Sequence, residues 1–230
     1  MKIIDFHAHI LPRLDHGSRS SQVSLAQLQL MSQAGVDTVC ATSHFYPQEI
    51  LVDDFLEARA ASLARLLEIS QNKPRPKIIL GAEVLICEGL DRMEGLEKLC
   101  LEGTDILLLE MPFSAGAWSD RLYRTVAEIS NRGIRPVFAH VDRYPYKLVE
   151  ALFDMGFQAQ LNAVCLSRLL KPKHLMRWIE EGKIIALGSD LHGDNAKAYK
   201  PFTKVCGSHG DQAQRIMENT DKLISSAVRH

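Results

Sequence analysis

The sequence lacks the features that would place the protein in a membrane, outside the cell or on nucleic acid. No apolar run approaches the roughly 20 residues of a membrane-spanning helix. The first residues do not form the long apolar segment of a secretory leader. A net charge of −1 gives no general attraction to nucleic acid or acidic lipid. We therefore expect a cytoplasmic protein with no nucleic-acid partner and no membrane insertion.

Paired cysteines are also lacking. The five cysteines are scattered and odd in number, and they form no CxxC motif. None of them is followed six positions later by arginine, which excludes the cysteine-dependent tyrosine phosphatases that hold phosphate with a Cys-x5-Arg loop. Scattered thiols without a disulfide pattern are typical of a reducing compartment.

What the sequence does contain is a regular alternation of short apolar strands with amphipathic helices. Alternation of this kind builds a parallel sheet, and strands that are apolar on both faces indicate a closed barrel. No repeat, low-complexity run or linker is visible, so we expect one α/β domain over residues 1–230, a (β/α) barrel. The seven expected strands cover residues 2–6, 37–42, 77–83, 105–110, 136–140, 157–162 and 184–190.

Six of the seven strands end in histidine or a carboxylate. In such barrels the carboxyl ends of the strands converge on one face, which carries the chemistry. At the first strand, His7 and His9 are two residues apart and can reach one metal ion from the same side. The candidate metal ligands are His7, His9, His16, His44, Glu83, Glu110, His140, Asp190 and His192.

This ligand set is too large for one ion, which takes about four to six ligands, so we expect two or three ions bridged by carboxylates. Imidazole and carboxylate without thiolate suit Mn, Fe or Zn. Arg143 follows His140 by three residues and is placed to hold phosphate with a bidentate fork; the alternative is a surface salt bridge. The remaining histidines, His174, His209 and His230, are expected at the solvated surface.

The candidate residues lie in the segments DFHAHILPRLDHG, TSHFYP, GAE, LLLEMPF, PVFAHVDRYP and GSDLHGDN. These segments resemble the PHP (polymerase and histidinol phosphatase) superfamily. Within it, the chain is similar to the CpsB/YwqE-type tyrosine phosphatases of bacterial capsule and exopolysaccharide loci. The resemblance implies a distorted barrel of seven parallel strands and hydrolysis of phosphotyrosine on a protein such as a bacterial tyrosine kinase.

The resemblance also implies a trinuclear site supported by manganese. For a general acid, the nearest candidates in the sequence are Asp15 and Arg143. The chain departs from the family where His16 replaces a carboxylate and in the loop at 193–201. By likeness, the first ion is held by His7, His9, Glu83 and Asp190, the second by Glu83, Glu110 and His140, and the third by His16, His44 and His192.

Three alternatives stay open. A phosphoesterase for a small substrate such as histidinol phosphate would use similar ligands. A binuclear amidohydrolase also begins with His-x-His, but it expects lysine where this chain has Glu110. A weakly catalytic regulatory protein that binds phosphotyrosine is disfavoured by the complete ligand set.

Overall fold

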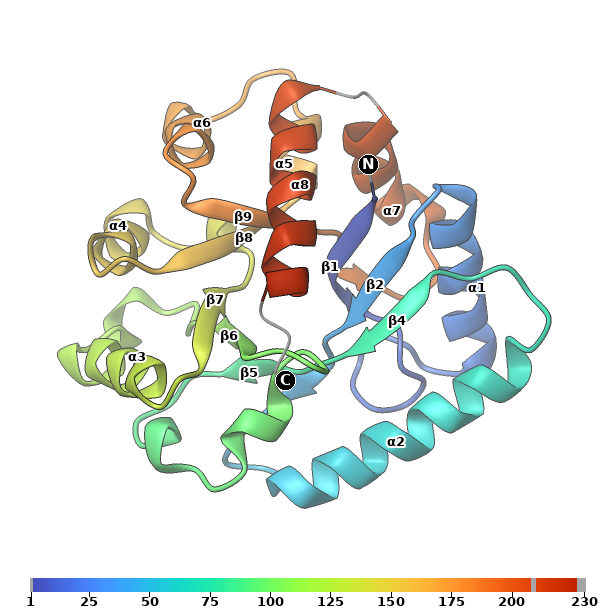
Figure 1. Ribbon diagram of the computed structural model, residues 1–230, viewed down its shortest axis with the longest axis horizontal. Helices are drawn as coiled ribbons and strands as arrows, with labels where there is room; N and C mark the ends of the chain where they lie inside the picture. The colour runs from blue at the N-terminus through green and yellow to red at the C-terminus, as the bar shows by residue number, and fades with distance from the viewer. Residues whose placement is uncertain (1, 208–209, 227–230) are drawn as a thin grey trace.

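The computed structural model describes residues 2–207 and 210–226, and all pairs between its strands are parallel (Figure 1). The strands are β1 (Ile4–His9), β2 (Thr38–Ala41), β3 (His44–Phe45), β4 (Lys77–Leu80), β5 (Glu83–Leu85), β6 (Ile106–Glu110), β7 (Arg135–Phe138), β8 (Gln158–Asn162), β9 (Ile184–Gly188) and β10 (Leu191–His192). They form two sheets with the orders β10-β1-β2-β4 and β3-β5-β6-β7-β8-β9.

Helices follow most of the strands, as the alternation predicts. Two of them begin at serine caps: Ser20 accepts from the N–H of Val23, and Ser119 accepts from the N–H of Leu122. The α-helices are α1 (Ser21–Gln33), α2 (Val52–Ile69), α3 (Asp120–Asn131), α4 (Tyr146–Asp154), α5 (Val164–Ser167), α6 (Lys173–Glu180), α7 (Ala196–Gly207) and α8 (Asp211–Ser226). Short 3-10 helices are η1 (Leu90–Arg92), η2 (Leu96–Leu99), η3 (Ala115–Ala117) and η4 (Val141–Arg143).

The two sheets share three chain segments, and this sharing closes them into a distorted barrel. β3 continues β2, β5 continues β4, and β10 continues β9, each after a break of two residues. β2 pairs with β4 and β3 with β5, while β10 pairs with β1, so the ring contains seven chain segments. The N–H of Asp190 donates to the carbonyl of His7 at 2.8 Å across the third break. The expected distorted barrel of seven parallel strands is therefore confirmed.

The breaks themselves differ from the sequence prediction, which had continuous strands at 37–42, 77–83 and 184–190. Glu83 begins β5 instead of ending a strand, and His44 begins β3. These two residues are register partners in the second sheet, so their side chains start from adjacent positions. Interruption of the strands thus places two candidate ligands side by side.

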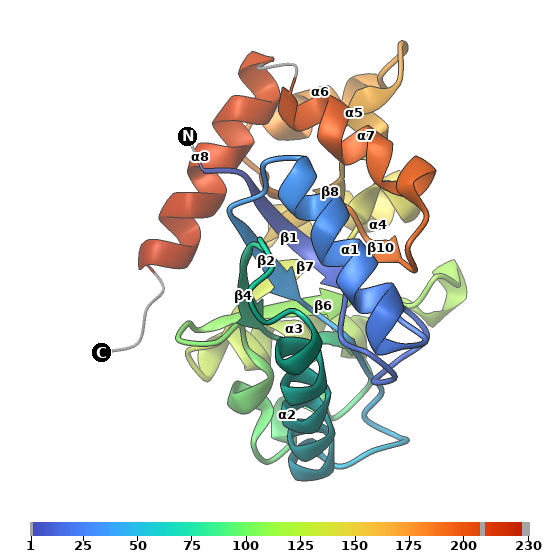
Figure 2. The ribbon, with the colours of Figure 1, turned by 90° about the vertical axis from the view of Figure 1, so that its right-hand side faces the viewer.

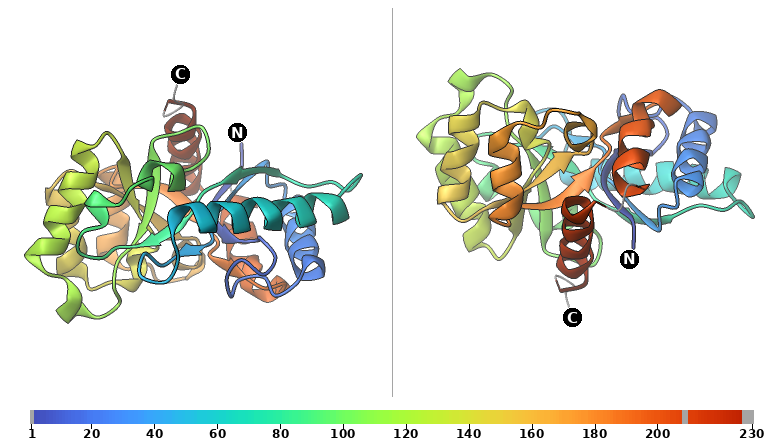
Figure 3. Two further views of the ribbon diagram at one scale, coloured as in Figure 1. Left: turned by 90° about the horizontal axis from the view of Figure 1, so that it is seen from below. Right: turned by 90° about the horizontal axis from the view of Figure 1, so that it is seen from above.

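Two apolar clusters hold the barrel together. The larger lies between the strands and the surrounding helices and includes Trp178 and Phe202. The smaller is shared by strands around the ring, including Phe6 and Leu108, and by Leu223 of α8. In Figures 2 and 3 α8 stands on one side of the barrel, and in Figure 2 β10 lies on the other. Polar side chains occupy the end of the barrel that faces away from α8.

Candidate metal centre

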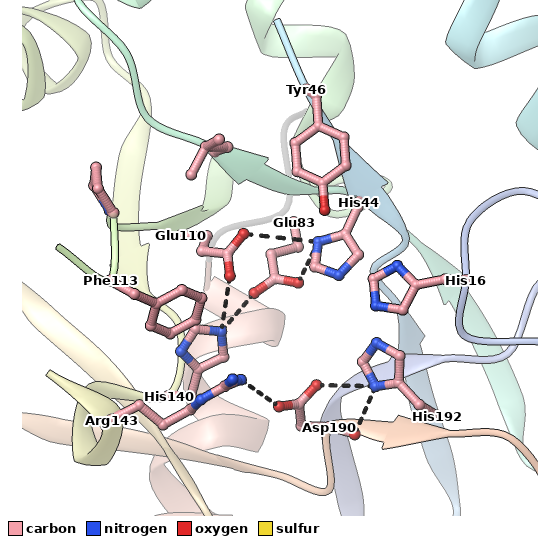
Figure 4. Close-up of a pocket in the computed structure, with 12 residues that line it drawn as sticks. His16, His44, Tyr46, Glu83, Glu110, Phe113, His140, Arg143, Asp190 and His192 are labelled. Carbon is pink, nitrogen blue, oxygen red and sulfur yellow. Dashed lines mark hydrogen bonds and ion pairs between the residues drawn. The ribbon is translucent and has the colours of Figure 1, made fainter. Parts of the chain in front are cut away.

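The nine candidate ligands converge at the carboxyl ends of the strands, and Figure 4 shows those that line the pocket there. His7 and His9 of β1 are fully buried at the base of this cluster. The other seven line a cavity of about 860 Å³. They come from the 10–20 loop, β3, β5, β6, β10 and the turns after β7 and β9. The structure thus brings the nine side chains together at one end of the barrel.

Glu83 occupies the centre of the cluster. Its Oε1 lies 2.7 Å from Nε2 of His140 and 3.5 Å from Nε2 of His7. Its Oε2 lies 3.0 Å from Nδ1 of His44 and 3.4 Å from Nε2 of His9. Burial alone would raise the pKa of Glu83, but the surrounding imidazoles hold it well below the usual range. A carboxylate that faces four imidazoles with both oxygens has the position that a bridging ligand requires.

Glu110 differs from Glu83 in its electrostatics although the two are neighbours. Its Oε1 is 3.6 Å from His140 and its Oε2 is 3.7 Å from His44. Burial and the nearby charge of Glu83 raise the pKa of Glu110. Like charges this close oppose each other, and a cation between them removes the conflict.

Three histidines have one ring nitrogen in a hydrogen bond outside the cluster, and their other ring nitrogen points into the cluster. Nδ1 of His9 lies 2.8 Å from Oδ2 of Asp15, and since a carboxylate only accepts, the proton is on Nδ1. Nδ1 of His7 lies 2.6 Å from the hydroxyl of Thr42. Nδ1 of His192 donates to the carbonyl of Asp190 at 3.0 Å. Outer contacts of this kind orient imidazoles for a metal.

Six buried atoms of the cluster make no hydrogen bond with any of the described residues. Buried polar atoms almost always have a partner, so a group of unsatisfied ones at one place indicates a ligand. Burial, followed by the charge of His9, lowers the pKa of His192 to about 4, which keeps its lone pair available. The unsatisfied atoms of the cluster are Nε2 of His7, His9 and His192, Nδ1 of His44 and His140, and Oε2 of Glu83. This donor set fits divalent metal ions.

Four groups of three residues bring ligand atoms within 4.8 Å of one another, near enough to share an ion. The groups are His7-His9-Glu83, His7-His140-Asp190, His44-Glu83-Glu110 and His9-His44-His192. His16 belongs to none of them, but its ring stacks at 4.8 Å from the rings of both His44 and His192. The centre can therefore hold more than one ion.

The backbone around the candidate ligands has unusual features that bring their side chains together. A Cβ at Gly17 would come within 2.1 Å of the Cβ of His9, so the loop approaches β1 only because residue 17 has no side chain. His140 and Asp190 both adopt positive φ, 32° and 53°. Such backbone strain in residues other than glycine is concentrated at functional sites.

Asp190 joins the cluster to Arg143 and to two amide side chains that the sequence did not indicate. Its Oδ1 is 3.4 Å from Nε2 of His7, and its Oδ2 accepts from Arg143 and from the amide of Asn162, both at 3.2 Å. The Asn162 amide oxygen in turn accepts from Gln160. Asn162 ends β8, so the strand-end pattern that identified the ligands contained this signal too.

The opposite wall of the cavity is apolar and aromatic. Leu85 and Pro112 line it together with Phe113, whose ring is 52% exposed. The guanidinium of Arg143 lies 4.5 Å from the centre of the Phe113 ring. Tyr46 stacks against His44 at 5.3 Å. Figure 4 shows Phe113 and Arg143 on one side of the cluster and Tyr46 on another. Arg143 was a candidate from the sequence, but residue type gave no reason to select the apolar and aromatic residues of this wall.

Asp15 lies behind His9, not in the main cavity. Both of its oxygens accept hydrogen bonds, one from Gly17 N–H and the other from His44 N–H and the His9 ring. Although burial opposes it, the bond to His9 holds the pKa of this carboxyl well below its usual range. An ionised carboxylate that is fully engaged has no proton to donate.

Residues expected away from the site are only partly as predicted. His174 is outside the cluster, but it is half-buried and its ring lies 5.0 Å from Trp178, so the expectation of a solvated residue is wrong. His209 and His230 lie outside the described residues. None of the five cysteines forms a disulfide in the described part of the chain. No helix described here has both the length and the apolar character that a bilayer crossing requires.

Two tyrosine-protein phosphatases are similar to this chain in sequence over most of its length. The tyrosine-protein phosphatase CpsB of Streptococcus pneumoniae is 28% identical over 249 aligned positions, which cover 96% of this chain and 98% of the relative. The tyrosine-protein phosphatase YwqE of Bacillus subtilis is 24% identical, with 83% of this chain and 77% of the relative covered.

The fold is shared with solved structures. A chain from the structures of YwqE from Bacillus subtilis and CpsB from Streptococcus pneumoniae, described as metal-dependent tyrosine phosphatases, superposes with a TM-score of 0.78 at 21% identity. It covers 99% of this chain and 96% of that one. The family model for capsular polysaccharide synthesis proteins, CpsB/CapC, matches residues 3–224. With the model covering almost every residue, the chain belongs to the CpsB/CapC family.

Proposed function

We propose that the protein is a metal-dependent phosphatase that hydrolyses phosphotyrosine in proteins. The observation that carries this proposal is the apolar and aromatic wall beside the nitrogen and carboxylate cluster. A phosphotyrosine has a charged phosphoryl group and an aromatic ring, and the cavity offers a matching environment for each. The relatives named tyrosine-protein phosphatases support the same substrate class.

The metal site we propose is polynuclear. His7, His9, Glu83 and Asp190 would hold a first ion, Glu83, Glu110 and His140 a second, and His16, His44 and His192 a third. Mn²⁺ is the proposed metal, with Fe or Zn as alternatives that suit the same donor set. When bound, such ions lower the pKa of water to give a hydroxide nucleophile and neutralise charge on the phosphoryl group.

The chain itself supplies orientation and charge. We assign Arg143 to hold the phosphoryl oxygens, because its guanidinium is half-exposed at the cavity and is positioned by Asp190 and the Phe113 ring. We assign Asp15 to orient His9, in place of a role as general acid, since its carboxylate is already engaged. A phenol has a pKa of about 10, so its departure needs less protonation than that of an alkoxide.

The substrate would be a phosphorylated protein and, given the family, a bacterial tyrosine kinase of capsule or exopolysaccharide synthesis in the cytoplasm. A test compares the Mn²⁺-loaded protein on a phosphotyrosine peptide, histidinol phosphate and a phosphodiester. We expect the highest kcat/KM on the peptide. Faster hydrolysis of histidinol phosphate would assign the protein to small phosphomonoesters, and binding of the peptide without turnover would assign it a regulatory role.

Phe113→Ala sharpens this test. If the ring packs against the substrate's phenol, the variant loses about tenfold in kcat/KM on the peptide, a typical effect of one aromatic contact. Hydrolysis of histidinol phosphate should hardly change. Leu51→Ala, at another exposed apolar residue away from the cavity, is the matched control. An equal loss on both substrates would remove the aromatic wall from the proposal.

A further inference from the structure

The segment between α5 and α6 has two adjacent leucines almost entirely in solvent. Leu169 is 98% exposed and Leu170 is 87% exposed. Single exposed leucines are ordinary in soluble proteins, but a consecutive pair at this level of exposure is not. In Figure 2 the segment between α5 and α6 projects outward at the top of the molecule. The two side chains are therefore available to a partner without any rearrangement.

Exposed cations flank the leucines on both sides. Arg168 precedes them, and Lys171 and Lys173 follow. We call residues 168–173 the α5–α6 tip. Long basic side chains can extend their apolar stems along an apolar surface while their charged groups stay in water. The tip thus combines an apolar point with a basic rim.

The neighbouring helix α7 enlarges the basic surface. The ammonium of Lys204 contacts the carbonyl of Ser167, at 3.4 Å, which places α7 beside the tip. Lys197 and Lys200 of α7 are also exposed. The sequence has no Asp or Glu at 155–179 or at 195–210. A chain with a net charge of −1 therefore has cations and no acids in the sequence that surrounds its most exposed leucines.

We propose that the α5–α6 tip and α7 dock on the surface of an anionic lipid bilayer. The leucines enter the headgroup boundary, and the surrounding lysines and arginine pair with lipid phosphates. A bilayer is favoured over a protein because the leucines project. A rigid protein would need a matching pocket to bury them, whereas lipid deforms around a convex point. This contact is peripheral and requires no membrane-spanning helix.

The position of the tip gives the contact a consequence for the cavity. α5 begins two residues after Asn162, the residue that ends β8 and bonds to Asp190. Both the tip and the cavity are therefore at the carboxyl end of the strands. Docking through the tip would hold the cavity near the bilayer, within reach of phosphorylated segments attached to the membrane.

Vesicle flotation with the full chain tests the proposal. Vesicles of phosphatidylcholine with about 30% phosphatidylglycerol are compared with pure phosphatidylcholine at low and high salt. We expect at least about tenfold stronger partitioning to the anionic vesicles at low salt, and loss of that preference at high salt. Leu169→Ser with Leu170→Ser should weaken binding about fivefold without changing charge, and Arg168→Gln, Lys171→Gln and Lys173→Gln together should remove most of it.

Matched controls separate the tip from charge and hydrophobicity in general. Leu51→Ser changes a leucine that is 73% exposed elsewhere, and Arg65→Gln, Lys73→Gln and Arg75→Gln remove three exposed cations from the region of α2. Both should bind like wild type, and all variants should keep the wild-type melting temperature. Equal binding to neutral and anionic vesicles, or equal losses in tip and control variants, would overturn the proposal. Binding of an acidic peptide at the tip without vesicle binding would overturn it in favour of a protein partner.

Discussion

Strand β1 contains two kinds of buried polar group within five residues. Asp5 is fully buried, and so are His7 and His9. Oδ1 of Asp5 accepts from the N–H of Ser189 at 2.8 Å, and Oδ2 accepts from the hydroxyl of Tyr199 at 3.1 Å. Each histidine instead has one nitrogen bonded and Nε2 without a partner.

This difference in hydrogen bonding distinguishes a residue that stabilises the fold from residues that are suited to bind a metal. Asp5 joins β1 to the end of β9 and to α7, and its hydrogen bonds compensate its burial, although burial still raises its pKa to about 6. His7 and His9 are equally buried but incompletely bonded, a state that persists only where something else supplies the missing contact. Changes around the histidines should therefore affect metal binding and turnover, and changes around Asp5 should affect stability.

Glu83→Gln should give the largest effect, because it removes charge from the centre of the unsatisfied cluster. The side chain keeps its shape but no longer attracts two cations. We expect metal content, measured by atomic emission, to fall by more than one ion per chain. We expect kcat/KM to fall by more than about 10²-fold, since loss of an outer partner alone costs about 10–100-fold.

The control for this change is Glu88→Gln, which alters an exposed carboxylate paired with Arg121. Chelation should reproduce the effect in the wild type, and added Mn²⁺ should reverse it. Replacement of all five cysteines by serine should leave turnover in place. Full metal content and full activity in Glu83→Gln would show that Glu83 is not a bridge.

Arg143→Ala should give the second largest effect, about 10²-fold in kcat/KM or roughly 2.7 kcal/mol, as for one preorganised donor in an active site. Arg143→Lys keeps the charge but loses the two-pronged geometry, so it should not restore activity. Metal content and melting temperature should hardly change in either variant.

The rival interpretation treats Arg143 as a surface ion pair with Asp190. It predicts near-normal kinetics and at most about 1 kcal/mol of lost stability. Arg121→Ala, which breaks an exposed pair with Glu88, shows the size of that effect. Wild-type kcat/KM in both Arg143 variants would support the rival.

Asp15→Asn should weaken the metal site by about tenfold, because the amide orients His9 less firmly than the carboxylate does. Metal titration of the purified apoprotein measures the change. Asp37→Asn is the control: Asp37 accepts from the N–H of Ile3 at 2.7 Å, far from any candidate ligand. If Asp15→Asn bound metal like wild type but lost activity, Asp15 would belong to the chemistry and not to the orientation of His9.

That the candidate ligands lie together was predictable because strand ends have a sequence signature. Apolar runs alternating with helices indicate a barrel. A histidine or carboxylate at the end of most of these runs indicates side chains that meet on one face of that barrel. His140 and Asp190 were found in this way although both have unusual backbone angles. Long-range partners were not predictable, since nothing local to His7 indicates that Thr42 will fix its ring.

The cavity wall and the strand breaks show the same limit. Phe113 lies in a loop without periodicity. Its proposed role depends on contact with Arg143, which is 30 positions away in the sequence. Breaks within strands depend on how neighbouring segments meet across the ring, so the sequence predicted one strand where the structure has β4 and β5. The sequence predicts which types of residue follow the strands and in what order. Which of these residues touch one another depends on how the barrel closes.

The smallest effect should come from Tyr199→Phe, which tests the role of Asp5, the buried group on β1 whose hydrogen bonds are complete. The variant removes one donor to Asp5 and leaves the ring, which is buried, in place. A hydrogen bond to an acidic group contributes about 1.5 kcal/mol, so urea unfolding should show a loss of that order. Metal content and kcat/KM should equal those of the wild type, because Tyr199 contacts no candidate ligand. Tyr123→Phe, which removes a half-buried donor to the Leu148 carbonyl, should cost less because water can replace it. A fall in metal content with Tyr199→Phe, at unchanged stability, would show that Asp5 acts on the metal centre and that the two kinds of buried group on β1 are not separate.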